Sequence, residues 1–173
     1  MREFVMRVSD FDNAYALHQK VWSGVKKLVG DGIQFVFREA DGYVKVRHSA
    51  GEVGRPCLIP ETGKRYRFDV LVNPVRSSND SSKKVAVASP EEAIAIVKRH
   101  LEKNGFSVQS AGGDFLQGNM LGKPGLKNFR IRSFLAYGEV LVVDGEKATV
   151  AMQKGIGAAK RFGYGMIELE GIK

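Results

Sequence analysis

The chain has 173 residues, 43% of them hydrophobic, and is long enough for one ordinary domain or two small ones. Lys and Arg number 27 against 19 Asp and Glu, and the net charge of +8 favours a polyanionic partner such as nucleic acid, although such a charge also keeps a protein soluble without one. The single cysteine, Cys57, excludes an internal disulfide or a CxxC site, and no apolar run approaches the ~20 residues of a membrane span, so we expect a cytoplasmic protein without a membrane partner.

The first fifty residues predict a strand, a helix and a hairpin. Residues 2–8 alternate between apolar and polar side chains, and Ser9, Asp10 and Asp12 are candidate N-caps for the helix that follows. One apolar face recurs at helical spacing over residues 13–28 and consists of Ala14, Leu17, Val21, Val25 and Leu28. Asp41-Gly42 is a dipeptide suited to tight turns, and it separates predicted strands at 34–38 and 43–48.

The rest of the chain alternates strands with two further helices. Residues 64–72 predict a strand, and 77–84 predict a mobile loop because the segment has no apolar residue to bury. Ser89-Pro-Glu-Glu92 combines a cap, a first-turn proline and two acids, and it predicts a helix that ends at Gly105. The remaining predicted elements are a strand at 106–110, a glycine-rich loop at 112–125, a hairpin of 129–134 with 139–143, a helix at 147–153 and a strand at 164–169.

This order of elements predicts an α+β fold built from two related halves. From residue 64 the order is strand, helix, strand, strand, helix, strand, which is the ferredoxin-like pattern. The first fifty residues give the opening of the same pattern without its second helix. We therefore expect two tandem ferredoxin-like (RRM-like) halves, 1–63 and 64–173, the first abbreviated, each with helices on one face of an antiparallel sheet.

The segment 155–165 carries two Gly-x-Gly pairs around a basic insert. Glycine allows a left-handed backbone and close approach of N–H groups to an anion, so the segment is either a phosphate-binding loop or an ordinary glycine-rich turn. A dinucleotide fingerprint fails because Lys160 stands at its third glycine position, and a P-loop fails because no Gly-Lys-Ser/Thr is present. The candidate RNA-binding residues here are Gly155, Gly157, Lys160, Arg161, Gly163 and Gly165.

Tyr15, His18 and Trp22 recur at helical spacing and border the apolar face of the first predicted helix. They either seal the edge of a sheet or present a catalytic group. An imidazole, whose unperturbed pKa is about 6.5, can take a proton from a ribose 2′-hydroxyl or give one to a departing 5′-oxygen. The other two histidines, His48 and His100, are expected to be exposed.

Two further patterns concern RNA contacts and metal ions. Arg130 and Arg132 lie two apart on a predicted strand and so share a face, which either contacts RNA or is solvated. The carboxylates are scattered, without a DxD, HExxH or paired-Asp pattern. We therefore expect no metal and no other cofactor.

Two segments resemble one protein family in the correct order. Ala14-Tyr-Ala-Leu-His-Gln-Lys-Val-Trp22 resembles the catalytic helix, and residues 155–169 resemble the signature loop and last strand, of the CRISPR-associated repeat-processing endoribonucleases, specifically the CasE subfamily. Residues 66–74 and 134–143 are similar to strands that the family places between them. The chain departs from the family between His48 and Lys64, where the family usually carries another helix and strand.

The resemblance implies an enzyme that cleaves CRISPR precursor RNA within the repeat hairpin, leaving a 2′,3′-cyclic phosphate and a 5′-hydroxyl. It implies that His18 transfers a proton, that Tyr15 assists and that Lys160 stabilises the charge on the phosphate; whether His18 is base or acid stays open. The product would stay bound, with the protein a subunit of a Cascade-type effector complex. The alternative is a non-catalytic subunit that binds structured RNA.

Overall fold

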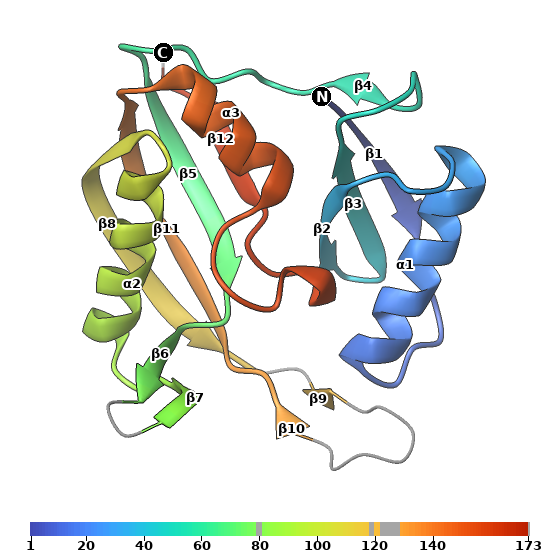
Figure 1. Cartoon of the computed structure of the whole chain (residues 1–173), viewed down its shortest axis with the longest axis horizontal. Coiled ribbons are helices and arrows are strands. Elements are labelled where there is room, and N and C mark those ends of the chain that lie inside the picture. The colour runs from blue at the N-terminus through green and yellow to red at the C-terminus, as the bar shows by residue number, and fades with distance from the viewer. Residues whose placement is uncertain (79–80, 118–119, 122–128, 173) are drawn as a thin grey trace.

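Two four-stranded antiparallel sheets lie side by side in the computed structural model, which describes residues 1–78, 81–117, 120–121 and 129–172 (Figure 1). The N-terminal sheet has the order β2-β3-β1-β4 and the C-terminal sheet the order β12-β5-β11-β8. If the strands of each half are numbered 1 to 4 in chain order, the N-terminal sheet has the order 2-3-1-4 and the C-terminal sheet the order 4-1-3-2. These are the same order read from opposite edges, and it is the order of a ferredoxin-like sheet. The predicted fold of two ferredoxin-like halves is confirmed.

The N-terminal sheet keeps its fourth strand but has no second helix. Its elements are β1 (Arg2–Arg7), α1 (Ala14–Leu28), β2 (Phe35–Ala40), β3 (Tyr43–His48) and β4 (Arg55–Pro56). Strand β4 is only two residues long and pairs with the start of β1. The β2-β3 turn is formed by Asp41 and Gly42, whose φ angles of 53° and 78° are both positive, as a two-residue hairpin turn requires.

The C-terminal half has the complete set of six elements. They are β5 (Arg65–Val72), α2 (Pro90–Lys103), β8 (Phe106–Leu116), β11 (Ser133–Val142), α3 (Gly145–Lys154) and β12 (Ile167–Gly171). Helix α2 begins as predicted, because the Ser89 side chain accepts a hydrogen bond from the Glu92 N–H and Pro90 occupies the first turn. A short 3-10 helix, η1 (Lys160–Phe162), lies between α3 and β12.

Segment 77–84 is not the predicted loop. It belongs to a hairpin of β6 (Val75–Ser78) and β7 (Ser81–Ala86), and residues 79–80 lie outside the described part of the chain. The prediction failed because it required apolar residues to bury. The two strands instead satisfy their backbone groups by pairing with each other, which needs no buried side chain.

The predicted hairpin of 129–134 and 139–143 is also wrong. Residues 133–142 form one strand, β11, while β10 (Phe129–Arg130) pairs with β9 (Met120–Leu121). Gly138, at φ 155°, keeps β11 continuous next to a bulge, since a side chain there would lie 2.1 Å from the Ser110 carbonyl oxygen.

The predicted loop at 112–125 is replaced in part by strand β8, which extends to Leu116. At Gly113 the strand passes so close to the Phe134 ring that a Cβ would lie 2.5 Å from it. Glycine at this position therefore permits close packing of a strand, and it does not indicate a loop. Residues 118–119 and 122–125 of the predicted loop lie outside the described residues.

Each sheet buries one face under helices. Helix α1 covers the N-terminal sheet with Leu17, Val21 and Val25, while Ala14 is buried in a separate cluster with Ile131 and Tyr164. Leu28 is 51% exposed, contrary to the prediction. The N-cap of α1 is Asn13, and not Ser9, Asp10 or Asp12. Helices α2 and α3 cover the C-terminal sheet and form its core with residues such as Val97, Leu101 and Met152. No helix in the described part of the chain is long and apolar enough to cross a membrane.

A buried arginine joins the two sheets. Arg47 on β3 has a side chain only 2% exposed, and its guanidinium donates to the Ile167 carbonyl at 2.6 Å. It also lies 3.2 Å from the carboxylate of Glu168 on β12 and 3.4 Å from that of Glu3 on β1. The contacts with Ile167 and Glu168 cross from one half to the other and hold β12, which follows the glycine-rich segment, against the N-terminal half.

Candidate functional site

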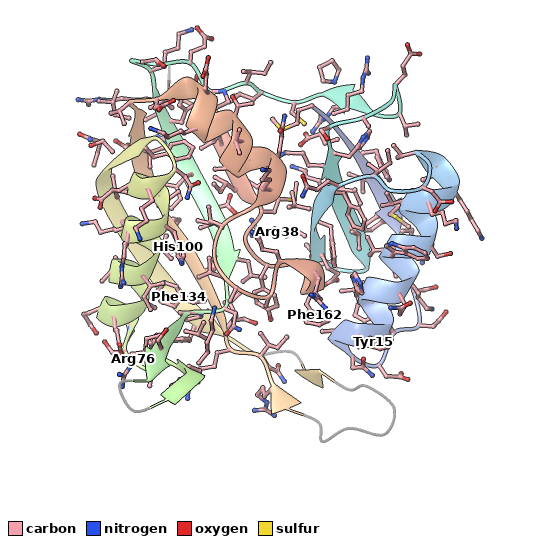
Figure 2. All side chains as sticks on the ribbon, in the orientation of Figure 1. Tyr15, Arg38, Arg76, His100, Phe134 and Phe162 are labelled. Atoms are coloured by element: carbon pink, nitrogen blue, oxygen red, sulfur yellow. The ribbon has the colours of Figure 1, made fainter. Side chains whose placement is uncertain are left out.

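The candidate site lies where helix α1 meets the glycine-rich segment. Asn13 starts the helix by accepting hydrogen bonds from the N–H groups of Tyr15 and Ala16, at 3.0 Å each. The apolar face of α1 packs on the N-terminal sheet, and this turns His18 toward η1, where its ring meets that of Phe162 edge-on at 6.0 Å between centroids. Figure 2 shows Tyr15 on α1 near Phe162 of η1.

His18 is half-buried, and this environment favours its neutral form. Burial lowers the pKa of the imidazole below its ordinary value, and the positive charge of Arg161 lowers it further. A hydrogen bond with the Arg161 backbone raises the pKa, but by less than burial lowers it. The Nδ1 atom is buried and has no hydrogen-bond partner among the described residues. A neutral imidazole is suited to accept a proton at neutral pH.

The predicted stripe of Tyr15, His18 and Trp22 divides into two parts. Tyr15 is half-buried and packs with Phe162 against a small cluster that contains Ile131 and Tyr164. Trp22 is 48% exposed, and the Lys26 ammonium lies 5.5 Å from the centre of its ring. Only Tyr15 and His18 therefore face the glycine-rich segment.

The four glycines of the segment all adopt positive φ angles, between 67° and 88°. The N–H groups of Gly155, Gly163 and Gly165 already donate to backbone carbonyls within the protein. Gly165 is the most constrained, since its N–H donates to the Leu71 carbonyl at 2.6 Å. These three glycines shape the turn and are not free to hold a phosphate through their N–H groups. The predicted phosphate contacts would then fall to Gly157 and to the basic side chains of the segment.

The same glycine geometry explains why the last strand begins later than predicted. The predicted strand at 164–169 starts inside the turn made by Gly163 and Gly165, where positive φ angles are incompatible with an extended strand. Strand β12 therefore begins at Ile167.

The two cations of the segment act on different histidines. Lys160 and Arg161 are both exposed on η1. The charge of Arg161 lowers the pKa of His18, whereas the charge of Lys160 lowers the pKa of His100 on α2. Arg161, predicted only to bind RNA, is thus the cation that acts on the candidate catalytic histidine. The role predicted for Lys160 at His18 stays a prediction.

Arg130 and Arg132 do not share a strand face. Strand β10 ends at Arg130, which is exposed, and Arg132 follows in the connection to β11. Arg132 donates to the Val87 carbonyl at 3.3 Å, and its guanidinium lies 5.6 Å from the centre of the Phe115 ring. It is directed toward the C-terminal half, and the two side chains are therefore not paired by strand alternation.

The expectation that the other two histidines are exposed is wrong. His48 is 1% exposed, because β3 is the second strand of its sheet and Phe4 packs on the ring at 5.7 Å. Its Nε2 lies 3.0 Å from the Val53 carbonyl oxygen. His100 is half-buried and lines a cavity with Arg99 and Lys103 of the same helix. The i, i+4 spacing of Arg99 and Lys103 was a signal in the sequence that these two cations share a helix face.

The chain resembles known proteins in both sequence and fold. A family model described as "CRISPR associated protein" matches residues 58–170. The CRISPR-associated endoribonuclease Cse3 of Thermus thermophilus is 30% identical over 125 residues, which make up 66% of this chain. The match spans 58% of that relative's length.

Solved structures show the same fold. A Cse3 bound to a 19 nt RNA superposes with a TM-score of 0.79 at 23% identity, covering 98% of this chain and 100% of that one. Cas6e from Escherichia coli K-12 gives 0.73 at 19% identity, covering 99% and 98%. A chain of a CRISPR RNA-guided surveillance complex gives 0.75 at 19% identity, covering 99% and 100%.

Proposed function

Because the chain belongs to the family of CRISPR-associated proteins, we propose that it is an endoribonuclease that cuts CRISPR precursor RNA within the repeat hairpin. The observation that carries the proposal is the contact between His18 and Phe162, which brings the one half-buried histidine of α1 onto the basic, glycine-rich segment. The Thermus relative is itself named an endoribonuclease, and a similar fold has been solved with RNA bound.

The proposed reaction uses the RNA's own 2′-hydroxyl as the nucleophile. His18 takes the proton of that hydroxyl, and the oxygen attacks the neighbouring phosphorus. The bond to the 5′-oxygen breaks, and the departing oxygen takes a proton from water or from the Tyr15 hydroxyl. The products are a 2′,3′-cyclic phosphate and a 5′-hydroxyl. The lowered pKa of His18 favours the role of base, which the sequence had left open.

The cations of η1 would stabilise the extra negative charge on the phosphate in the transition state. Arg161 is exposed and its charge reaches His18, so it is positioned for this role, and Lys160 is the second candidate. No step of this reaction requires a metal ion, and we propose that the enzyme works without one.

After cleavage the protein would keep its product. A net charge of +8 favours retention of a polyanion, and a chain of similar fold has been solved within an RNA-guided surveillance complex. We propose that this protein serves as the Cascade-type subunit that holds the hairpin of the guide RNA.

The test combines one protein variant with one substrate variant. His18→Ala should slow cleavage of labelled repeat RNA by roughly two to four orders of magnitude, the usual contribution of a positioned proton-transfer group. Replacing the 2′-hydroxyl before the cut with hydrogen should abolish cleavage by the unaltered protein. The matched control is Gln19→Ala, which changes an exposed neighbour on the same helix. Affinity for the 2′-deoxy RNA verifies that each variant still folds and binds.

Three results would contradict the proposal in different ways. Cleavage of the 2′-deoxy RNA would mean that water is the nucleophile. Loss of activity in EDTA, restored by Mg²⁺, would refute metal independence. Tight binding of repeat RNA with no product from the unaltered protein would favour the alternative function, a non-catalytic RNA-binding subunit.

A further inference from the structure

A basic cavity lies on the side of the glycine-rich segment that faces away from α1. It has a volume of about 590 Å³ and lies between α2, the β6-β7 hairpin and the first residues of the segment. Its basic lining comes from Arg76, Lys84, Arg99, His100 and Lys103. Figure 2 shows Arg76 and His100 on neighbouring elements of the C-terminal half, apart from Tyr15 and Phe162.

The charge of this cavity is almost entirely positive. Four cations line it, and no carboxylate among the described residues does so. Arg76 is partly neutralised, because Glu92 at the start of α2 lies 3.2 Å from it. The other three cations, which come from β7 and α2, leave an uncompensated positive field, and a concave surface concentrates such a field.

His100 lies at the centre of these charges. It is half-buried, and a Cβ added to Gly157 would lie 3.9 Å from its Nε2, so the imidazole is next to the glycine-rich segment. Burial is the largest cause that lowers the pKa of His100, followed by the charges of Arg99, Lys103, Lys160 and Lys84. These cations belong to α2, η1 and β7. An anion in the cavity would offset their repulsion from three sides.

The cavity and the candidate catalytic site share the glycine-rich segment as a wall. Gly157 and Ala158 line the cavity, and Phe162, a few residues further on, contacts His18. The basic insert lies between the cavity and His18: the charge of Lys160 lowers the pKa of His100, and the charge of Arg161 lowers the pKa of His18. A polyanion held at His18 could therefore continue along the segment into the cavity.

We propose that this cavity binds backbone phosphates of the same RNA strand, next to the bond cut at His18. The proposal rests on the proposed function, since it takes the substrate to be RNA. A strand with its phosphates at regular intervals matches cations spread over α2, β7 and η1 better than one small anion would. His100 is a binding residue in this account and takes no part in the chemistry.

The first experiment measures affinity with a matched pair of lysines on α2. Lys103 lines the cavity, whereas Lys98 is exposed on the same helix and does not. Affinity of the full-length protein for 2′-deoxy repeat RNA is measured between 0.05 and about 0.3 M salt. Each phosphate contact on a single strand contributes about 0.7 to the slope of log affinity against log salt, or about fivefold in affinity at 0.1 M salt.

Lys103→Ala should therefore weaken binding about fivefold, and Arg99→Ala with Lys103→Ala about 25-fold, with salt slopes lower by about 0.7 and 1.4. Lys98→Ala should leave both quantities unchanged. If Lys103→Ala and Lys98→Ala have equal effects in a protein that binds and cuts RNA, the cavity does not bind the RNA phosphates, and the proposed function is unaffected. A protein that neither binds nor cuts RNA would refute the proposed function itself.

The second experiment uses His100 as a reporter. Bound phosphate stabilises the imidazolium, so the pKa of His100, followed by NMR, should rise when 2′-deoxy repeat RNA is added. His100→Gln identifies the signal. A parallel titration with inorganic phosphate distinguishes the source of the anion. If inorganic phosphate raises the pKa and RNA does not, the cavity takes a small free anion, and the proposal is wrong.

Discussion

Replacing Gly165 with alanine tests the packing of the glycine-rich segment. Gly165 has a φ of 82°, a backbone conformation that a residue with a Cβ rarely adopts. A Cβ at this position would also lie 2.1 Å from the carbonyl oxygen of Ile156, far inside van der Waals contact. Gly157 provides a matched comparison, because its φ is 74° but a Cβ would meet no atom closer than 3.9 Å. The two substitutions therefore share backbone strain and differ in the clash.

The expected magnitudes follow from these contacts. A left-handed alanine costs about 1–2 kcal/mol, and this is the whole cost at Gly157. At Gly165 the clash must also be relieved by moving the chain. This movement disrupts the hydrogen bonds from Gly165 N–H to Leu71 and from Ile156 N–H to Gly165, each worth about 1 kcal/mol. Gly165→Ala should then lower the free energy of unfolding by about 3–4 kcal/mol, roughly 2 kcal/mol more than Gly157→Ala.

Urea unfolding followed by circular dichroism measures both values. With a slope of about 2 kcal/mol per molar urea, the midpoint should fall by about 1.5–2 M for Gly165→Ala and by about 0.5–1 M for Gly157→Ala. The entropy that alanine removes from the unfolded chain is common to both and cancels in their difference. Equal midpoints for the two variants would refute the reasoning, because the approach of Gly165 to Ile156 would then carry no energy.

Two more outcomes follow from the charged groups. Arg47→Met should lower the free energy of unfolding by about 3 kcal/mol, because it leaves the partly buried carboxylates of Glu3 and Glu168 with fewer partners. Arg55→Met, at a side chain that is 74% exposed, should lower it by less than about 1 kcal/mol. Equal losses for the two variants in urea unfolding would contradict a role for burial. Arg161→Ala should raise the pKa of His18, because it removes a repelling charge and keeps the burial. As the base must be neutral, the rising limb of the normalised pH-rate profile should move to higher pH. If neither this limb nor the NMR titration of His18 moves, the charge of Arg161 does not lower the pKa of His18.

Local signals in the sequence predicted much of the fold. The Ser89-Pro90 start of α2 and the Asp41-Gly42 turn depend on residues next to each other in the chain, and both are confirmed. The failures occurred where a distant residue decides the structure. Gly113 and Gly138 suggested breaks in the chain, but each lies inside a strand where a neighbouring strand or ring leaves no room for a Cβ. The sequence does not reveal such neighbours.

The candidate site shows the same division. The helical spacing of Tyr15 and His18 placed both on one side of α1, and the structure brings that side onto the glycine-rich segment. The burial of His48 could not be predicted, because it results from the position of β3 between two other strands. The basic cavity beside His100 was missed for a similar reason, since cations from β6 and β7 meet those of α2 only after a hairpin forms where a loop had been expected.

The contact between His18 and Phe162 also has a consequence for biosynthesis. The two residues come from opposite ends of the chain, and translation produces the N-terminal part first. A nascent chain that has completed the first sheet therefore has its histidine but lacks the loop against which the histidine is buried. If the proposed activity is correct, the protein cannot cut RNA while it is still attached to the ribosome with its last segment unreleased. Nascent-chain complexes stalled before residue 155 should be inert toward repeat RNA.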